Sequence, residues 1–235
     1  MQQQVLVFPV VAGKTDDDAH IIGDEFAKRV DEYRESRDRL GIALERAYLQ
    51  KTPMGSFVVV YGESRDGFDT ATAGMVQSDL AIDKFFVDSV REIHGFDMTQ
   101  PPPGPSPETI GMWNDPDVTV RKPGFAFCAP LLPDTEEAGR AFTTQAFGSD
   151  DMARTRRAMG ISKEIVTLLK TPAGDLIAVY LEGDDPVAAN AEFAASDDPF
   201  NVWFKGELAK LFPPFVDFNQ PVPPVTEIFD SLALA

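Results

Sequence analysis

The residues best suited to bind a small molecule lie in two β-rich segments, 46–63 and 180–182. A phenol or guanidinium that points into an apolar pocket can hydrogen-bond a polar ligand, and a carboxylate can sit at the pocket mouth. The candidate ligand-binding residues are Arg46, Tyr48, Tyr61, Glu63, Tyr180 and Glu182. The alternative is a packed core in which the tyrosines reach backbone or water and the glutamates are exposed at strand ends. The sequence leaves both interpretations open and identifies no catalytic residue.

A second pair of carboxylates, Glu45 and Glu164, recurs at equivalent positions of the chain. Two carboxylates related by a pseudo-twofold axis could serve as acid and base if their environments pushed their pKa values apart. Alternatively, each glutamate marks the solvated start of a strand or pairs with a local basic group, because surface ion pairs are common.

The residues that most often bind metals are few. His20 and His94 are the only histidines and Cys128 is the only cysteine. No pair has the spacing of metal ligands, so we expect no metal site and no cofactor. His94 ends a predicted helix, where a cationic side chain would complement the helix dipole. Cys128 lies on a predicted buried strand, where cysteine usually behaves as a small hydrophobic residue.

The composition is that of a folded protein that needs no disulfide: 235 residues, 43% of them hydrophobic. A single cysteine fits a reducing compartment. The formal net charge of −17 argues against a nucleic-acid partner, because phosphate binding needs clustered lysine and arginine. The apolar run at 5–11 is too short to span a bilayer and lacks the features of a signal peptide. We therefore expect a cytoplasmic protein without a membrane partner.

An internal repeat organises the chain. Residues 41–66 align without a gap with residues 160–185, and 12 of the 26 positions are identical, where chance would give about 2. The shared residues include the turn sequence Lys-Thr-Pro-x-Gly at 51–55 and 170–174, and the sequence Tyr-x-Glu at 61–63 and 180–182. We interpret the chain as two copies of one fold, residues 1–118 and 119–235.

Each copy is expected to follow the order β-α-β-β-α-β, the ferredoxin-like arrangement with both helical layers on one face of a four-stranded sheet. The proline and glycine of each repeated turn predict a hairpin. We expect the helical region of the second copy to break near 148–149, and Asp185 and Asp198 to cap the helices that follow them. The proline-rich run 101–105 predicts a stiff extended connection. A short last strand, near 110–113 in the first copy and near 225–229 in the second, should complete the sheet of its own copy.

The alternation in the third strand of each copy assigns its two faces. Val58 and Val60 lie on a purely aliphatic face, which we assign to the helices, whereas Tyr61 and Glu63 lie on the mixed face. Two sheets that pack through such mixed faces would bury each other's apolar surface. We therefore predict an α+β protein whose two repeats form one pseudo-twofold α/β barrel, a pseudo-dimer within one chain. Further association of whole chains is left open.

This pattern resembles the dimeric α/β-barrel superfamily, which includes antibiotic-biosynthesis monooxygenases, EthD-like proteins and chlorite-dismutase-like haem proteins. Within it, the chain is most similar to DUF6176-type domains. The resemblance rests on the strands with Glu45 and Glu164, the repeated hairpin, the Tyr-x-Glu strand ends, and the aromatic helices near Phe85 and Phe204. Haem members use a histidine as axial ligand, and the second copy contains no histidine, so the resemblance does not extend to haem.

The function expected from these observations is the binding of a small organic molecule between the two sheets. The resemblance implies, as an enzymatic version, a cofactor-independent oxygenase or an isomerase. The alternative is a non-catalytic structural or interaction protein whose barrel is filled with side chains. A cavity of about 300 Å³ or more, lined by the candidate tyrosines, would favour the ligand.

Overall fold

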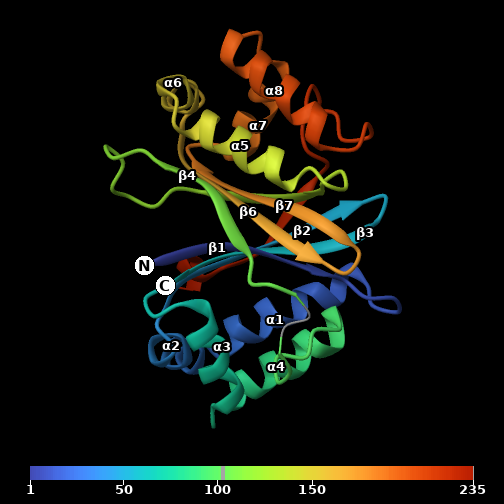
Figure 1. Ribbon diagram of the computed structural model, residues 1–235. Coiled ribbons are helices and arrows are strands. Elements are labelled where there is room, and N and C mark those ends of the chain that lie inside the picture. Colours follow the sequence, from blue (N-terminus) through green and yellow to red (C-terminus); the bar gives the residue numbers. More distant parts are fainter. Residues whose placement is uncertain (102–103, 235) are drawn as a thin grey trace. The chain divides into compact units, whose positions relative to one another are not determined.

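The structure is a computed structural model that describes residues 1–101 and 104–234. Within these residues the chain forms two compact units (Figure 1). The first unit contains the chain up to Pro101 and again from Thr226, and the second extends from Gly104 to Val225. Residues 102 and 103, which belong to the proline-rich run discussed above, lie outside the described residues.

The first unit contains a sheet with the strand order β1-β3-β2-β8. Strand β3 pairs antiparallel with both β1 and β2, and helices α1–α4 cover one face of the sheet (Figure 1). Its elements are β1 (Gln2–Pro9), α1 (Asp16–Lys28), α2 (Val30–Arg39), β2 (Ile42–Thr52), β3 (Gly55–Ser64), α3 (Phe68–Gln77), α4 (Ala81–His94), β8 (Val225–Asp230) and the 3-10 helix η1 (Ser231–Leu234).

The second unit has the equivalent sheet, with the order β4-β6-β7-β5 and antiparallel neighbours throughout. Helices α5–α8 cover one of its faces (Figure 1). Its elements are β4 (Glu108–Asn114), β5 (Gly124–Pro130), α5 (Glu136–Phe147), α6 (Asp150–Ala158), β6 (Ile161–Thr171), β7 (Gly174–Gly183), α7 (Pro186–Ala195) and α8 (Pro199–Leu211). The predicted α+β class with two tandem ferredoxin-like halves is confirmed.

Local signals in the sequence place most element boundaries correctly. Helix α5 ends at Phe147 and α6 begins at Asp150, so the predicted break is present. The side chains of Asp185 and Asp198 accept hydrogen bonds from the backbone amides of the helices that they precede. Gly41 and Gly160 each have a φ of 70°, a left-handed conformation that favours glycine. Their recurrence therefore has a geometric reason.

The helical region of the first copy differs from the sequence-based prediction. The order β-α-β-β-α-β predicts one helical stretch between the first two strands, but the structure of the first copy contains two helices, α1 and α2, that meet at Arg29. Arg29 leaves the helical conformation, with φ of −122° and ψ of 45°. Because the apolar spacing continues on both sides of this residue, periodicity alone did not reveal the break.

The fourth strand of each copy pairs in the sheet of the other copy. Strand β4, from the first repeat, pairs with β6, and β8, from the second repeat, lies beside β2. The expectation that each copy closes its own sheet is therefore wrong. Both strands are short and lie at sheet edges, and an alternating pattern does not specify the partner of an edge strand. The repeats 1–118 and 119–235 remain a prediction about the duplication, and they differ from the compact units in these strands.

The predicted face assignment of the third strands is confirmed on the helical side. Val58 and Val60 pack in a cluster with Ala19 of α1, and Ile177 packs with Leu211 of α8. The residues predicted for the opposite face, such as Tyr61 and Tyr180, are fully buried. The pairing of the two sheets as one barrel stays a prediction.

Candidate functional site

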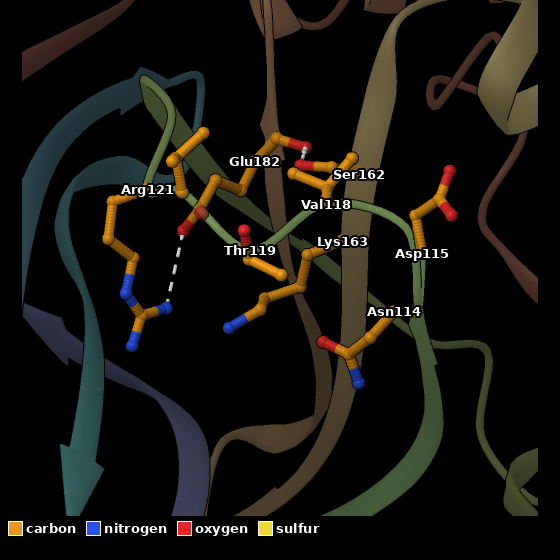
Figure 2. A pocket seen from close by; sticks show the side chains of 9 residues that line it. Asn114, Asp115, Val118, Thr119, Arg121, Ser162, Lys163 and Glu182 are labelled. Atoms are coloured by element: carbon orange, nitrogen blue, oxygen red, sulfur yellow. Dashed lines mark hydrogen bonds and ion pairs between the residues drawn. The ribbon is translucent and has the colours of Figure 1, made fainter.

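The second unit contains a pocket of about 280 Å³ (Figure 2). It lies where β4 and β7 end and β6 begins, and the connection between β4 and β5 forms its remaining wall. The lining residues are Asn114, Asp115, Val118, Thr119, Val120, Arg121, Ser162, Lys163 and Glu182. All of these residues belong to the second unit.

The strand register brings three of these residues into one row. Lys163 of β6 lies opposite Asn114 of β4 on one side and Glu182 of β7 on the other. Directly opposed residues of neighbouring strands project from the same face of a sheet. On β5 the row continues with Gly124, which lies opposite Glu182 and has no side chain to occupy the space. The row therefore presents an amide, an ammonium and a carboxylate to the pocket.

Asp115 holds the connection that forms the wall of the pocket. Its carboxylate accepts hydrogen bonds from Nε and Nη2 of Arg157 at 2.8 and 3.0 Å, and from the backbone amide of Asp117 at 3.1 Å. Its own backbone amide donates to the carbonyl of Ser162 at 2.8 Å. The Arg157 guanidinium holds the pKa of the Asp115 carboxyl below its usual value. Asp115 is thus ionised at neutral pH and is engaged in fixing the chain rather than facing a ligand.

Glu182 is held rigidly at the end of β7. It is 3% exposed, and its carboxylate accepts hydrogen bonds from the Tyr180 hydroxyl at 2.8 Å and the Lys122 backbone amide at 3.2 Å. Nη1 of Arg121 lies 3.8 Å from the same carboxylate. The Ser162 hydroxyl donates to the backbone carbonyl of Glu182 at 3.1 Å. These contacts fix the orientation of the carboxylate at the pocket wall.

Two cationic side chains, Arg121 and Lys163, extend into the same space below Thr119 (Figure 2). Lys163 is 8% exposed, and the Arg121 side chain is 41% exposed. Lysine is seldom buried unless it has a charged or polar partner, so a buried lysine at a pocket wall indicates a polar environment. The pocket can therefore hold a polar or charged small molecule.

The predicted site residues are distributed over both units. Glu182 lines the pocket and Tyr180 orients it, whereas the equivalent Tyr61 hydroxyl donates to Glu63 in the first unit. Glu63 is fully buried and also accepts a hydrogen bond from the Gln3 amide at 3.2 Å. The expectation of strand-end glutamates exposed to solvent is therefore wrong, because each carboxylate is covered and hydrogen-bonded by its neighbours.

The other two predicted residues lie on β2. Nε of Arg46 donates to Asp230 at 3.0 Å, and Asp230 ends β8, the strand contributed by the second repeat. Tyr48 is 1% exposed. Neither residue lines the pocket of the second unit.

Sequence analysis missed most of the pocket, including Asn114, Arg121 and Lys163. A signal was present in Lys163, a charged residue in a strand that is buried from Ile161 to Leu169. A charged residue at such a position is unusual enough to mark a site. Arg121 gave no comparable signal, because it lies in the irregular connection that precedes β5.

Glu45 and Glu164 each pair with a buried arginine, as one of the sequence-based alternatives expected. Glu45 accepts a hydrogen bond from Nε of Arg37 at 2.6 Å, and Glu164 pairs with Arg156. The two arginines are also 119 residues apart. All four charged groups lie between a helix and the sheet, and Glu164 is only 5% exposed. The alternative that placed these glutamates in solvent is wrong.

His94 and Cys128 are both buried. Nδ1 of His94 lies 2.9 Å from the Pro9 carbonyl, and because a carbonyl only accepts hydrogen bonds, Nδ1 carries the proton. Burial lowers the pKa of His94, so the imidazole is neutral at pH 7 and is not the cation expected at the end of α4. Burial raises the pKa of the Cys128 thiol to about 12, so this thiol is protonated at neutral pH.

Among residues 1–101 and 104–234, no group of three or more histidine, cysteine or acidic side chains is arranged to hold a metal ion. In the same part of the chain, every helix is too short or too polar to cross a lipid bilayer.

The fold is similar to that of two solved structures. The first is described as a putative monooxygenase from Fusobacterium nucleatum subsp. nucleatum, with 10% identity and a TM-score of 0.52 over 97% of this chain and 91% of that one. The second is described as an anthrone oxidase-like protein, with 10% identity and a TM-score of 0.47 over 90% and 86% of the two chains. No protein-family model and no curated protein sequence matches the chain. At this identity, the likeness to the first structure is one of fold.

Proposed function

We propose that this protein binds a small organic molecule in the pocket of the second unit. The observation that supports the proposal is the row of Asn114, Lys163 and Glu182 beside a concave space of about 280 Å³. Pockets for small ligands commonly have volumes of about 300–1,000 Å³ with a few well-placed polar groups. The space therefore suits a compact ligand, and the fixed carboxylate and the ammonium would orient it.

The enzymatic version of this function uses Glu182 as a base. Its carboxylate lines the pocket, and the Tyr180 hydroxyl holds one of its oxygens at 2.8 Å. A carboxylate fixed in this way can accept a proton from a bound carbon acid if the ligand lies within hydrogen-bond reach. Proton abstraction from carbon begins an isomerisation, and it also prepares a substrate for direct reaction with oxygen. We therefore retain an isomerase or a cofactor-independent oxygenase as the enzymatic candidates.

A non-catalytic structural or interaction protein is the second candidate. The specific observation that favours it is the hydrogen bond between each strand-end tyrosine and its own glutamate, Tyr61 with Glu63 and Tyr180 with Glu182. The first unit forms this pair too, which is what a packing role shared by both repeats requires.

Native mass spectrometry of freshly purified protein tests ligand binding. We expect a co-purifying adduct in the wild type that is lost in Thr119→Trp, because a large ring at this lining position would fill the pocket. Thr99→Trp, at an exposed position of the first unit, is the matched control and should keep the adduct. An adduct that persists in Thr119→Trp would show that the molecule binds elsewhere.

Deuterium exchange separates the enzymatic candidate from the binding candidate. If Glu182 is a base, the wild type should exchange a carbon-bound proton of the co-purified molecule with solvent deuterium. Glu182→Gln should retain the adduct and lose the exchange, because the amide is of similar shape but is not basic. Equal exchange in both proteins would exclude Glu182 as the base.

A further inference from the structure

We propose that residues 115–123 form a strap that moves away from the sheet to admit a small molecule to the pocket, and that Arg157 is the positioning residue that holds this strap in place. The role of the strap rests on the proposed function, because it controls access to the same pocket. The path of the chain and the contacts that fix it support this role.

The strap crosses the end of the second sheet. The strand order places β4 and β5 at opposite edges, with β6 and β7 between them. The connection from β4 to β5 must therefore pass the ends of both inner strands, and Figure 2 shows Val118 and Thr119 of this connection beside Ser162 of β6. Five of the nine lining residues belong to the strap. Its displacement would therefore remove most of one side of the pocket.

The half of the strap nearest β4 is fixed through one residue, Asp115. Its backbone amide donates to the Ser162 carbonyl at 2.8 Å, and its carboxylate accepts two hydrogen bonds from Arg157 at 2.8 and 3.0 Å. The turn that follows also closes on Asp115. The amide of Asp117 donates to its carboxylate at 3.1 Å, and the amide of Val118 donates to its backbone carbonyl at 3.2 Å. This half of the strap thus depends on Asp115 and its partners.

Arg157 ties the strap to the helical layer. It belongs to α6 and is not one of the lining residues. The preceding residue, Arg156, is buried and pairs with Glu164 of β6, so α6 is itself fixed to the sheet. A guanidinium that binds both oxygens of a carboxylate fixes the orientation of the contact as well as its distance. Arg157 therefore acts on the pocket through Asp115.

The rest of the strap has an unbonded middle and a tied end. Within the part of the chain that the structure describes, neither Thr119 nor Val120 has a hydrogen-bond partner, and Val120 is 67% exposed. Near β5, the Lys122 amide donates to the Glu182 carboxylate at 3.2 Å, and Arg121 contacts the same carboxylate at 3.8 Å. Segments with few buried contacts open locally at a low cost in free energy. Once the contact of Asp115 is lost, the β4 half can swing about the β5 end.

Alkylation of a cysteine placed at position 162 measures the entry of a small molecule. Ser162 lines the pocket from β6 and is 6% exposed, so a cysteine there should react with iodoacetamide only when the strap moves. The native Cys128 does not compete, because burial raises the pKa of its thiol to about 12. We expect Ser162→Cys to react slowly, and about tenfold faster when Arg157→Leu is added, because the charged hydrogen bonds that hold the strap are removed.

A matched control lies on the same helix. Arg154 of α6 also binds an aspartate through two hydrogen bonds, to Asp198 at 2.8 and 3.1 Å, and makes no contact with the strap. Arg154→Leu should leave the rate of alkylation unchanged. In Asp115→Asn, the further change Arg157→Leu should add little, because the carboxylate that it binds is already gone. Arg157→Lys keeps the charge and should restore most of the slow reaction.

Hydrogen exchange provides a readout that does not need the introduced cysteine. If Ser162→Cys fails to fold, the amides of Asp117 and Val118, which donate to Asp115, report on the same opening. Their exchange with deuterium should be about tenfold faster in Arg157→Leu than in the wild type, at an unchanged urea midpoint. Equal exchange in the two proteins would overturn the role of Arg157.

Three results of the alkylation experiment would overturn this inference. Equal rates with and without Arg157→Leu would show that Arg157 does not hold the strap. Equal acceleration by Arg154→Leu would indicate a general loosening of α6. Alkylation of Ser162→Cys as fast as that of a cysteine in a short peptide would show that the pocket is accessible without movement of the strap. None of these measurements needs the natural ligand, so the absence of a co-purifying adduct would count against the proposed function alone.

Discussion

Replacing Glu164 with glutamine should destabilise the protein far more than the same change at Glu45, although the two glutamates occupy equivalent positions. In the second unit, Glu164 is the hydrogen-bonded acidic partner of Arg156, which is 4% exposed. Among the described residues, Nη1 of Arg156 has no hydrogen-bond partner. Glutamine keeps the shape and one acceptor oxygen but removes the charge, so the guanidinium would remain buried without a counter-ion.

The expected loss in the free energy of unfolding follows from this burial. Removing one partner of a buried ion pair costs about 3–5 kcal/mol, because the remaining charge is uncompensated. The rings of Phe193 and Phe204, 5.3 and 5.1 Å from the guanidinium carbon, offset only part of this cost. We therefore expect Glu164→Gln to lose about 3–5 kcal/mol.

The equivalent change in the first unit, Glu45→Gln, should reduce the free energy of unfolding less. Nη1 of Arg37 lies 3.3 Å from Asp83 and 3.0 Å from the Ser36 hydroxyl, so a counter-ion remains after Glu45→Gln. Burial together with the charge of Glu45 raises the pKa of the Tyr33 hydroxyl, which therefore stays protonated and can donate to the glutamine. We expect a loss of about 1.5–3 kcal/mol, the value for one hydrogen bond to a charged group.

Urea unfolding followed by two probes distinguishes the units. Both tryptophans of the sequence, Trp113 and Trp203, lie in the second unit, so their fluorescence reports on that unit, whereas far-ultraviolet circular dichroism reports on both. The urea concentration at the midpoint of unfolding should fall further for Glu164→Gln than for Glu45→Gln. The slope of the unfolding free energy against urea concentration should stay unchanged. Equal losses, or a larger loss for Glu45→Gln, would refute the argument that Asp83 compensates Arg37.

Three further predictions concern His94, Cys128 and the exchanged strands. His94 is neutral in the folded protein and its pKa is lowered there. Its contribution to stability is therefore complete above the unfolded pKa of about 6.5 and is lost as the pH falls through the folded pKa. The melting temperature should drop more between pH 7 and pH 5 in the wild type than in His94→Gln, and parallel curves of melting temperature against pH would contradict this. Cys128 should react with a disulfide reagent at pH 8 only after urea is added, because its folded pKa is about 12; fast labelling of the native protein would show that the thiol is accessible. Fragments 1–118 and 119–235 should associate when mixed, as size-exclusion chromatography can detect, because each holds an edge strand of the other's sheet; two stable monomers that ignore each other would argue against the exchange.

The sequence predicted what local patterns determine. The alternation in β3 and β7, the hairpins and the capping aspartates each involve residues close together in the chain, and all are present in the structure. The partner of an edge strand depends instead on which sheet edge is available after folding. The pairing of β4 with β6 therefore could not be inferred from the pattern of β4 itself.

The candidate site was predicted only in part, for a related reason. Tyr180 and Glu182 were found because their spacing repeats in the first copy. Repetition reveals residues that both copies share, whereas Lys163 lines the pocket and has a leucine, Leu44, at the equivalent register position of the first copy. The pairing of Lys163 with Glu182 depends on a shift in strand register between Ile161 and Lys163. No pattern in the sequence predicts this shift. The differences between the repeats were thus more informative about the pocket than the similarities.

The position of β8 has a consequence for synthesis on the ribosome. The first sheet needs this strand beside β2, yet Glu45 and Ser231, which contact each other there, are 186 residues apart. At a translation rate of about 5–20 residues per second, the edge of β2 would stay uncovered in the nascent chain for on the order of ten seconds. An open edge of this kind is a template for aggregation. The second sheet, whose strands are made within one continuous stretch, can close first, so a chaperone that binds the growing polypeptide would be expected to protect the β2 edge.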